Sequence, residues 1–186
     1  MEEAIKKRCD WPRDNALMIE YHDKEWGVPV HDDLKLFEFI ILEGAQAGLT
    51  WQTVLNKREN YRKALDGFNP LKIVNYDDKD VKRLLENSGI IRNRLKIQST
   101  IINAKKFLEV KKEFGSFDAY VWQFVGKQVK NNFNSFRDIP AKTKESDAMS
   151  KDLIKRGFKF VGSTICYAFM QAVGMVNDHT TNCFRR

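Results

Sequence analysis

The apolar residues of this chain recur mainly with the spacing of helices. Between Asp33 and Leu42, apolar side chains stand three or four positions apart, as on one face of an α-helix. No stretch shows the alternation of a half-buried strand, and there is no internal repeat. The pattern predicts an all-α fold, and 186 residues suit a single domain over 1–186 with two helical lobes. The expected helices span residues 14–21, 33–47, 50–65, 78–88, 90–112, 117–124, 146–156 and 163–174, with residues 126–146 as a loop.

One residue conflicts with this pattern. Glu43 follows Leu36, Phe39 and Ile40 by seven, four and three positions, so its carboxylate lies on the apolar face of the predicted helix. A buried carboxylate is unfavourable unless it is paired, protonated or in contact with a ligand. An ion pair with one of the 32 Lys and Arg residues is the ordinary explanation, and a ligand pocket is the functional one.

Composition and charge narrow the class of protein. The hydrophobic fraction of 42%, with 13 Phe and 4 Trp, is enough for a sizeable core. The net charge of +7 favours a polyanionic partner such as nucleic acid, although a basic surface without a partner has the same composition. No stretch approaches the roughly 20 apolar residues of a membrane span, and the segment Met1–Arg8 lacks the apolar core of a signal peptide. We therefore expect a cytoplasmic protein that binds no membrane.

Cysteine and histidine residues gather near the two ends of the chain. Cys9 and His22 stand in an aromatic arm over residues 9–31, and His179 and Cys183 stand four positions apart near the other end. Two Cys and two His make a closed tetrahedral zinc set, which is structural because no position remains for water. Such a site would join the N- and C-terminal segments. The alternative is two unlinked pairs that occur by chance.

The other ligand-capable residues are expected to bind no metal. Cys166 lies among Tyr167, Phe169 and Met170, which predicts a core thiol. His31 precedes two aspartates and is expected at the surface. Three scattered cysteines, an odd number, also argue against a disulfide framework in this chain.

A glycine-bounded basic segment links the last two predicted helices. It runs from Lys155 to Thr164 and places Gly162, Ser163 and Thr164 at a helix start, with Lys159 beside them. Unpaired amides and the positive end of the helix dipole suit one DNA phosphate, as in a helix-hairpin-helix motif. An ordinary glycine-capped corner has the same pattern. Arg92, Arg94 and Lys96 offer a second phosphate contact or only a solvated basic face.

Several ordered motifs extend over nearly the whole chain. They are Cys9-x-Trp11, Tyr21-His22-Asp23-x-Glu25-Trp26-Gly27-Val28-Pro29, Leu42-Glu43-Gly44-x-Gln46-Ala47-Gly48-Leu49-x-Trp51, Lys57-Arg58-Glu59-Asn60-Tyr61-Arg62, Gly89-Ile90-Ile91-Arg92, Lys155-Arg156-Gly157-Phe158-Lys159-Phe160-Val161-Gly162 and Asn177-Asp178-His179. Together they resemble the DNA-3-methyladenine glycosylase I family. The resemblance implies a helix-hairpin-helix DNA glycosylase fold, and a monofunctional enzyme that removes 3-methyladenine from alkylated DNA and leaves an abasic site.

The resemblance also implies roles for single residues. It implies one structural zinc ion on Cys9, His22, His179 and Cys183. It implies a base pocket whose carboxylate is Glu43 and whose aromatic walls are Tyr21, Trp51, Trp26 and Trp11. One departure is Met18, which stands where the family often has a second pocket tyrosine and leaves one wall contact apolar.

A mechanism for these residues begins with base flipping, since the target cannot be reached inside a duplex. Leu49, after the helix-breaking Gly48, is a candidate plug for the gap in the stack; a core position is the alternative. Trp51 would attract the cationic base, and Glu43 and Tyr21 would bond to its edge. Asp178 lies near where larger helix-hairpin-helix glycosylases keep a catalytic aspartate, although holding the tail is its simpler role.

Two other classes of protein compete with the glycosylase. A non-enzymatic nucleic-acid binder would share the basic helical fold and the zinc site, but it gives no reason for Glu43, Trp51 and Tyr21 together. A metal-dependent hydrolase needs an open metal position, which a set of two Cys and two His does not leave. We expect a monomer whose partner is alkylated double-stranded DNA and whose product is the free base.

Overall fold

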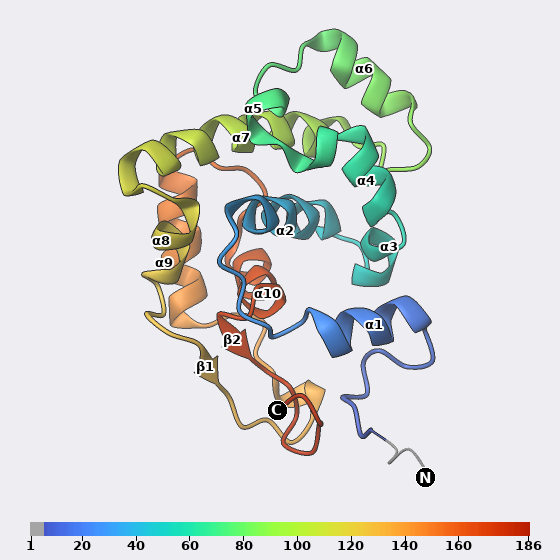
Figure 1. Cartoon of the computed structure of the whole chain (residues 1–186), viewed down its shortest axis with the longest axis vertical. Coiled ribbons are helices and arrows are strands. Elements are labelled where there is room, and N and C mark those ends of the chain that lie inside the picture. Colours follow the sequence, from blue (N-terminus) through green and yellow to red (C-terminus); the bar gives the residue numbers. More distant parts are fainter. Residues whose placement is uncertain (1–5) are drawn as a thin grey trace.

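The computed structural model describes residues 6–186 and is mostly helical, as predicted (Figure 1). Met1–Ile5, part of the segment in which no signal peptide is expected, lie outside the described residues. The elements are α1 Ala16–Lys24, α2 Asp33–Gln46, α3 Trp51–Leu55, α4 Arg58–Ala64, η1 Asp66–Phe68, α5 Pro70–Ile73, α6 Asp78–Glu86, α7 Arg94–Phe114, α8 Phe117–Trp122, β1 Val129–Lys130, η2 Phe136–Asp138, α9 Lys144–Lys155, α10 Ser163–Ala172 and β2 Val176–Asn177. Within the described part of the chain, no helix combines the length and the apolar character needed to cross a membrane.

Helix α2 is the centre of the fold. Asp32 begins it by accepting a hydrogen bond from the amide of Lys35. Every residue from Leu36 to Ala45 is buried, because α2 packs against α3, α7, α8 and α10 on different sides. In Figure 1, α2 lies in the middle with α7 above it, and α1 and the C-terminal end lie below. A helix that is buried all round is expected to be apolar all round, so a charged residue in it needs an explanation.

Helix starts differ from the predicted ones where a capping residue stands elsewhere. The long helix α7 begins at Arg94 rather than residue 90, because Asn93 accepts from the amide of Lys96. Helix α9 begins at Lys144 because Thr143 and Ser146 form a reciprocal cap. The predicted helix over 50–65 is in fact two helices, α3 and α4, separated at residues 56–57.

Two very short strands correct the expectation that the chain has none. β1 pairs in parallel with β2, with Val129 opposite Val176 and Lys130 opposite Asn177. Two residues are too few for alternation to appear in the sequence. The pairing holds the predicted loop over 126–146 against the C-terminal segment, and this places Asp178 and His179.

Candidate functional site

A cavity of about 140 Å³ opens beside the end of α2, between α1, α3 and α10. That volume is far above the roughly 10–15 Å³ that one water molecule needs. Every residue predicted to form the base pocket lines it: Trp11, Met18, Tyr21, Trp26, Glu43 and Trp51. Four further residues complete the lining: Gln46, Phe136, Ala168 and Gln171.

The aromatic side chains form a continuous wall. The Tyr21 ring lies 5.1 Å from the Trp51 ring, and the Trp11 ring lies 5.1 Å from that of Trp26 and 6.2 Å from that of Tyr21. Phe136, which belongs to η2, places its ring 6.4 Å from that of Trp11. These separations are typical of edge-to-face and tilted aromatic pairs, so the wall is packed rather than open. The cavity therefore has the largely aromatic lining that suits a planar ring system.

Glu43 lies on this cavity with no partner for its charge. Its exposed fraction is 2%, and within residues 6–186 no Lys, Arg or His forms an ion pair with it. Its Oε2 atom is buried without a hydrogen bond. Burial raises the pKa of Glu43 to about 8. The ion pair that would explain a buried carboxylate is absent from the described structure, and the ligand-facing alternative is the one that fits.

Two donors at the cavity also lack partners. The indole Nε1 atoms of Trp11 and Trp51 are buried without an acceptor. Buried polar atoms in folded proteins nearly always have a hydrogen-bond partner. Two unpaired donors and one unpaired carboxylate oxygen therefore lie around one cavity and are free to pair with a polar ligand.

The residues that the sequence did not predict for this cavity carried signals of different strength. Gln46 follows Glu43 by three positions on α2, and Gln171 follows Tyr167 and Ala168 by four and three on the apolar helix α10. Both are polar residues on an apolar helix face, the same signal that identified Glu43. Phe136 lies in a stretch that reads as a polar loop, and only the tertiary structure brings it to Trp11.

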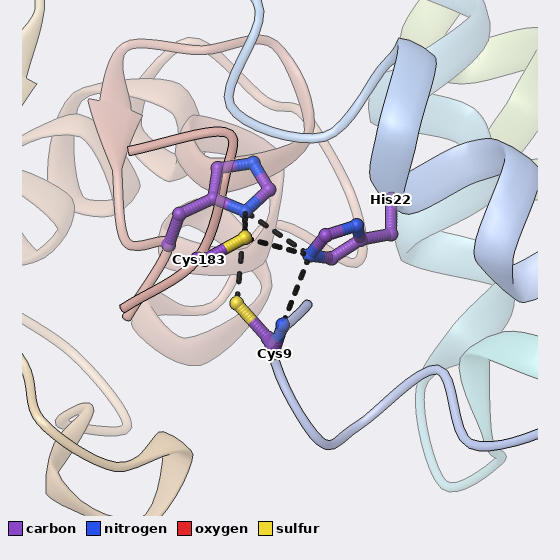
Figure 2. Close-up of side chains that lie close together, drawn as sticks. Cys9, His22 and Cys183 are labelled. Carbon is purple, nitrogen blue, oxygen red and sulfur yellow. Dashed lines mark hydrogen bonds between the residues drawn. The ribbon is translucent and has the colours of Figure 1, made fainter. Parts of the chain in front are cut away.

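Cys9, His22, His179 and Cys183 come together as predicted, and all four are buried. Figure 2 shows the labelled side chains of Cys9, His22 and Cys183 close together. The ligand atoms of all four residues lie within 4.8 Å of one another. His179 Nδ1 lies 3.2 Å from His22 Nε2, 3.6 Å from Cys9 Sγ and 3.4 Å from Cys183 Sγ. A tetrahedral ion with metal–nitrogen bonds near 2.0 Å and metal–sulfur bonds near 2.3 Å has ligand edges of roughly 3.3–3.8 Å. The four residues therefore form a group that could hold a metal ion.

The second ring nitrogen of each histidine already has a hydrogen-bond partner. His22 Nδ1 lies 2.8 Å from Asp23 Oδ1, which Arg8 also contacts, and His179 Nε2 lies 3.0 Å from the carbonyl oxygen of Trp26. A carboxylate or carbonyl only accepts, so these nitrogens carry the protons and the opposite nitrogens keep free lone pairs. Burial lowers the pKa of His179 to about 4, which keeps the imidazole neutral and able to bind a cation. Burial also raises the pKa of the Cys9 thiol to about 11, so a thiolate there requires a nearby positive charge.

The Cys/His group is built into the same segments as the cavity. Cys9 stands two residues before Trp11, and His22 directly follows Tyr21. The Trp26 ring lies 4.7 Å from the His179 ring, and the Trp26 carbonyl binds that imidazole. The Cys/His group therefore holds in place the segments that carry Trp11, Tyr21 and Trp26.

The turn between α2 and α3 is exposed. Leu49 is 42% exposed, so the alternative that it is a core residue is wrong. Gly48 has φ of +74°, a left-handed conformation that favours glycine. Lys96, expected in a phosphate contact or on a solvated face, instead donates from Nζ to the carbonyls of Ala45 and Ala47 at 2.8 and 2.7 Å. It occupies the negative end of α2 and holds the turn that carries Leu49.

The segment between α9 and α10 forms a tight corner. Asn103 of α7 accepts from the amide of Lys159 at 2.8 Å and donates to the carbonyl of Lys159 at 2.9 Å. Gly162 begins α10 without a side-chain cap, and Gly162, Thr164 and Lys159 are exposed while Ser163 is half-buried. The amides at this helix start are therefore available to an anion.

Cys166 and His31 lie where the sequence predicts them, in the core and at the surface. Cys166 is 2% exposed and packs in the core, where burial raises its pKa to about 12. His31 is at the surface, where it bonds to Asp118 at 2.8 Å and stacks on Trp122.

An ionic network that the sequence did not predict joins the elements around the cavity. Arg58 of α4 is 4% exposed and binds Glu38 of α2 and Glu25 at the end of α1. Arg62 also binds Glu38. The guanidinium of Arg58 lies 4.9 Å from the Phe39 ring. Three helices that line the cavity or flank it are therefore held in one geometry by buried and part-buried, charge-assisted hydrogen bonds.

Comparisons with known proteins identify the family of this chain. A model of the family described as methyladenine glycosylase matches residues 11–186. The DNA-3-methyladenine glycosylase 1 of Escherichia coli is 52% identical over 178 residues and 95% of both chains. The DNA-3-methyladenine glycosylase of Haemophilus influenzae is 48% identical over 177 residues, 95% of this chain and 96% of that protein.

Solved structures show the same fold. A crystal structure of a 3-methyladenine DNA glycosylase I has a TM-score of 0.94 at 55% identity, over 96% of this chain and 98% of that one. The structure of the Staphylococcus aureus enzyme, which describes its recognition of 3-methyladenine, has a TM-score of 0.93 at 30% identity, over 98% and 97% of the two chains. The chain belongs to the methyladenine glycosylase family.

Proposed function

We propose that this protein is a monofunctional DNA glycosylase of base excision repair. It flips 3-methyladenine out of alkylated double-stranded DNA, hydrolyses the N-glycosidic bond and leaves an abasic site. The observation that carries the proposal is Glu43: a buried, unpaired carboxylate facing an aromatic cavity, in a chain that belongs to the methyladenine glycosylase family.

The cavity is the base pocket. Trp51 stacks on the flipped base, and the cationic ring gains electrostatic attraction from the indole face in a desolvated site. Trp11 and Trp26 close the walls, and Met18 supplies a polarizable apolar contact. The positive charge of the bound base lowers the raised pKa of Glu43, and the ionised carboxylate accepts from the amino group of the base.

Selection follows from charge as well as shape. A methylated adenine carries a positive charge that an ordinary adenine lacks, so Glu43 and the ring of Trp51 bind it more strongly. The buried hydroxyl of Tyr21 adds a hydrogen-bonding group at the base edge. A normal base gains less binding free energy from each contact, so less of the unstacking energy is offset.

The chemistry needs little from the enzyme. The glycosidic bond breaks with its electron pair going to the base, which leaves neutral because it was cationic. Water adds to the anomeric carbon of the sugar and releases a proton. No lysine is among the residues that line the cavity in the described chain, so there is no amine for a covalent intermediate and we expect no strand cleavage.

DNA is held at two places in this proposal. The corner before α10 is a helix-hairpin-helix motif, in which the amides of Gly162, Ser163 and Thr164 bind one phosphate and Lys159 adds charge. At the other place, Leu49 on the exposed turn fills the gap left by the flipped base, and Gly48 lets the backbone approach the duplex.

The metal in this proposal is one structural zinc ion on Cys9, His22, His179 and Cys183. Two cysteines and two histidines with these spacings suit tetrahedral zinc, and the paired outer nitrogens of His22 and His179 fit neutral ligands. A closed set supplies no reactive water, so the ion stabilises the pocket wall and takes no part in hydrolysis. The chain would act as one domain over residues 1–186 and as a monomer.

The test is release of free base from methylated duplex DNA by the purified protein, followed by separation of the released bases. We expect 3-methyladenine as the product and intact DNA strands until alkali cleaves the abasic sites. The Glu43→Gln variant should bind DNA and release almost no base. Duplex binding by the wild type without base release would identify a non-enzymatic binder instead.

A further inference from the structure

Gln171 of α10 lines the cavity together with the predicted pocket residues. Its side-chain nitrogen Nε2 lies 2.8 Å from Oδ2 of Asp178, outside the cavity lining. A carboxylate offers only acceptors, so the nitrogen end of the amide must face Asp178. The carbonyl end, Oε1, is then the part of the amide left for a ligand.

Asp178 is held rigidly for this purpose. It is 1% exposed and accepts from Tyr167 Oη at 2.7 Å on the same oxygen that binds Gln171. Its other oxygen accepts from Asn131 Nδ2 at 2.7 Å. Asn131 directly follows β1 and Asp178 directly follows β2, so the strand pair brings the two residues together. The carboxylate cannot turn without breaking several buried hydrogen bonds.

The orientation matters because of the charge of the proposed ligand. With Oε1 toward the cavity, Gln171 adds a second acceptor to the carboxylate of Glu43. A cationic base that carries an amino group is favoured by both, whereas a donor in the same place would repel it. The flipped amide would therefore turn an attractive contact into a repulsive one.

We propose that Gln171 determines specificity by presenting its carbonyl oxygen to the cationic base, and that Asp178 is the positioning residue that fixes this orientation. The inference rests on the proposed function. Asp178 makes no contact with the base in this account, and the position at which larger relatives keep a catalytic aspartate serves here to orient a neutral amide.

The contact acts on binding more than on bond breaking. Oε1 faces the base before and after the glycosidic bond breaks, so its loss raises KM and leaves kcat nearly unchanged. One hydrogen bond to a charged group is worth enough to change an equilibrium constant about 5- to 30-fold. We expect Gln171→Met, which keeps the length of the side chain and removes the amide, to lower kcat/KM on methylated DNA by that factor. Gln123→Met, at an exposed position after α8, is the matched control.

Asp178→Asn tests the orientation. Asn131 Nδ2 donates to the other side of residue 178 and keeps the oxygen of the new amide there. The amide nitrogen therefore faces Gln171 and forces its carbonyl to turn toward residue 178, which points Nε2 at the base. We expect a loss at least as large as that of Gln171→Met. In the double variant Asp178→Asn/Gln171→Glu, the asparagine nitrogen donates to one glutamate oxygen and the other oxygen faces the cavity. This restores the acceptor and the net charge, so kcat/KM should return to within about threefold of the wild type, an acceptor being restored.

The experiment measures kcat and KM for base release from methylated duplex DNA, and the affinity for free 3-methyladenine by tryptophan fluorescence. Circular dichroism and metal content check that each variant folds. Wild-type protein that releases no base would refute the proposed function, whereas an active wild type with Gln171→Met within twofold of it would refute this inference alone. A double variant no better than Asp178→Asn would also refute it. If Asp178→Asn fails to fold, the KM and kcat of Gln171→Met still test whether Gln171 contacts the base.

Discussion

Replacing Glu43 by Gln should stabilise the protein while it removes the activity. The carboxylate is buried and unpaired, and burial raises its pKa from 4.5 to about 8. The folded protein therefore retains a proton that the unfolded chain releases above about pH 4.5. Stability contributed by the protonated form is complete below pH 4.5 and is lost as the pH rises toward 8.

The magnitude follows from this difference in pKa. At 1.36 kcal/mol per pH unit, the wild type loses about 3 kcal/mol of unfolding free energy by pH 7 and about 5 kcal/mol above pH 8. Gln does not ionise and avoids this loss. For a chain of this length, about 3 kcal/mol corresponds to a melting temperature higher by roughly 6–12 °C at pH 7. The value is an upper limit because the Gln amide is also buried.

The assay is urea unfolding of the wild type and Glu43→Gln from pH 5 to pH 9, with Glu86→Gln on the exposed face of α6 as the matched control. The advantage of Glu43→Gln should grow with pH and level off near pH 8, while its base release falls by several orders of magnitude. A constant difference across this range, or a variant with wild-type base release, would refute the assignment of Glu43 as an unpaired pocket carboxylate.

Further predictions concern the elements around the pocket. Leu49→Ala should slow release from duplex DNA and leave the affinity for free 3-methyladenine unchanged; equal losses in both assays would exclude a role in filling the duplex. Lys96→Met should lower unfolding free energy by about 1–3 kcal/mol, because it leaves the α2 carbonyls unpaired; the exposed Lys105→Met is the control. Purified protein should contain about one zinc ion per chain, and Cys183→Ser should abolish it; zinc-free, fully stable protein would contradict the ligand set. The logarithm of the DNA-binding constant should fall linearly with the logarithm of salt concentration, and salt-independent binding would argue against phosphate contacts.

The sequence predicts most helices because periodicity and caps are local. Asn93 and Thr143 show the limit of this approach, since each moves a helix start by forming a cap that competes with another polar residue nearby. The pairing of β1 with β2 joins residues far apart in sequence through two positions each, so no local pattern signals it. The hydrogen bonds between Asn103 and the backbone of Lys159 also join residues far apart in sequence, so no local pattern signals them.

The candidate site is predictable only in part, for a related reason. Glu43 is detectable because a charge on an apolar helix face is a local anomaly. Gln171 presents a weaker form of the same anomaly, and its meaning depends on Asp178, which reaches it through the turn after α10. Phe136 and the Arg58 network depend wholly on tertiary packing. Lys96 shows that a basic residue near a proposed DNA surface can serve the fold instead.

The most direct test of the account is base release from methylated duplex DNA by wild-type protein and by Glu43→Gln under single-turnover conditions. We predict that the wild type releases 3-methyladenine and leaves abasic sites in unbroken strands, and that Glu43→Gln binds the same DNA but releases almost none. Wild-type protein that binds the DNA and releases no base, or a Glu43→Gln variant as fast as the wild type, would contradict it.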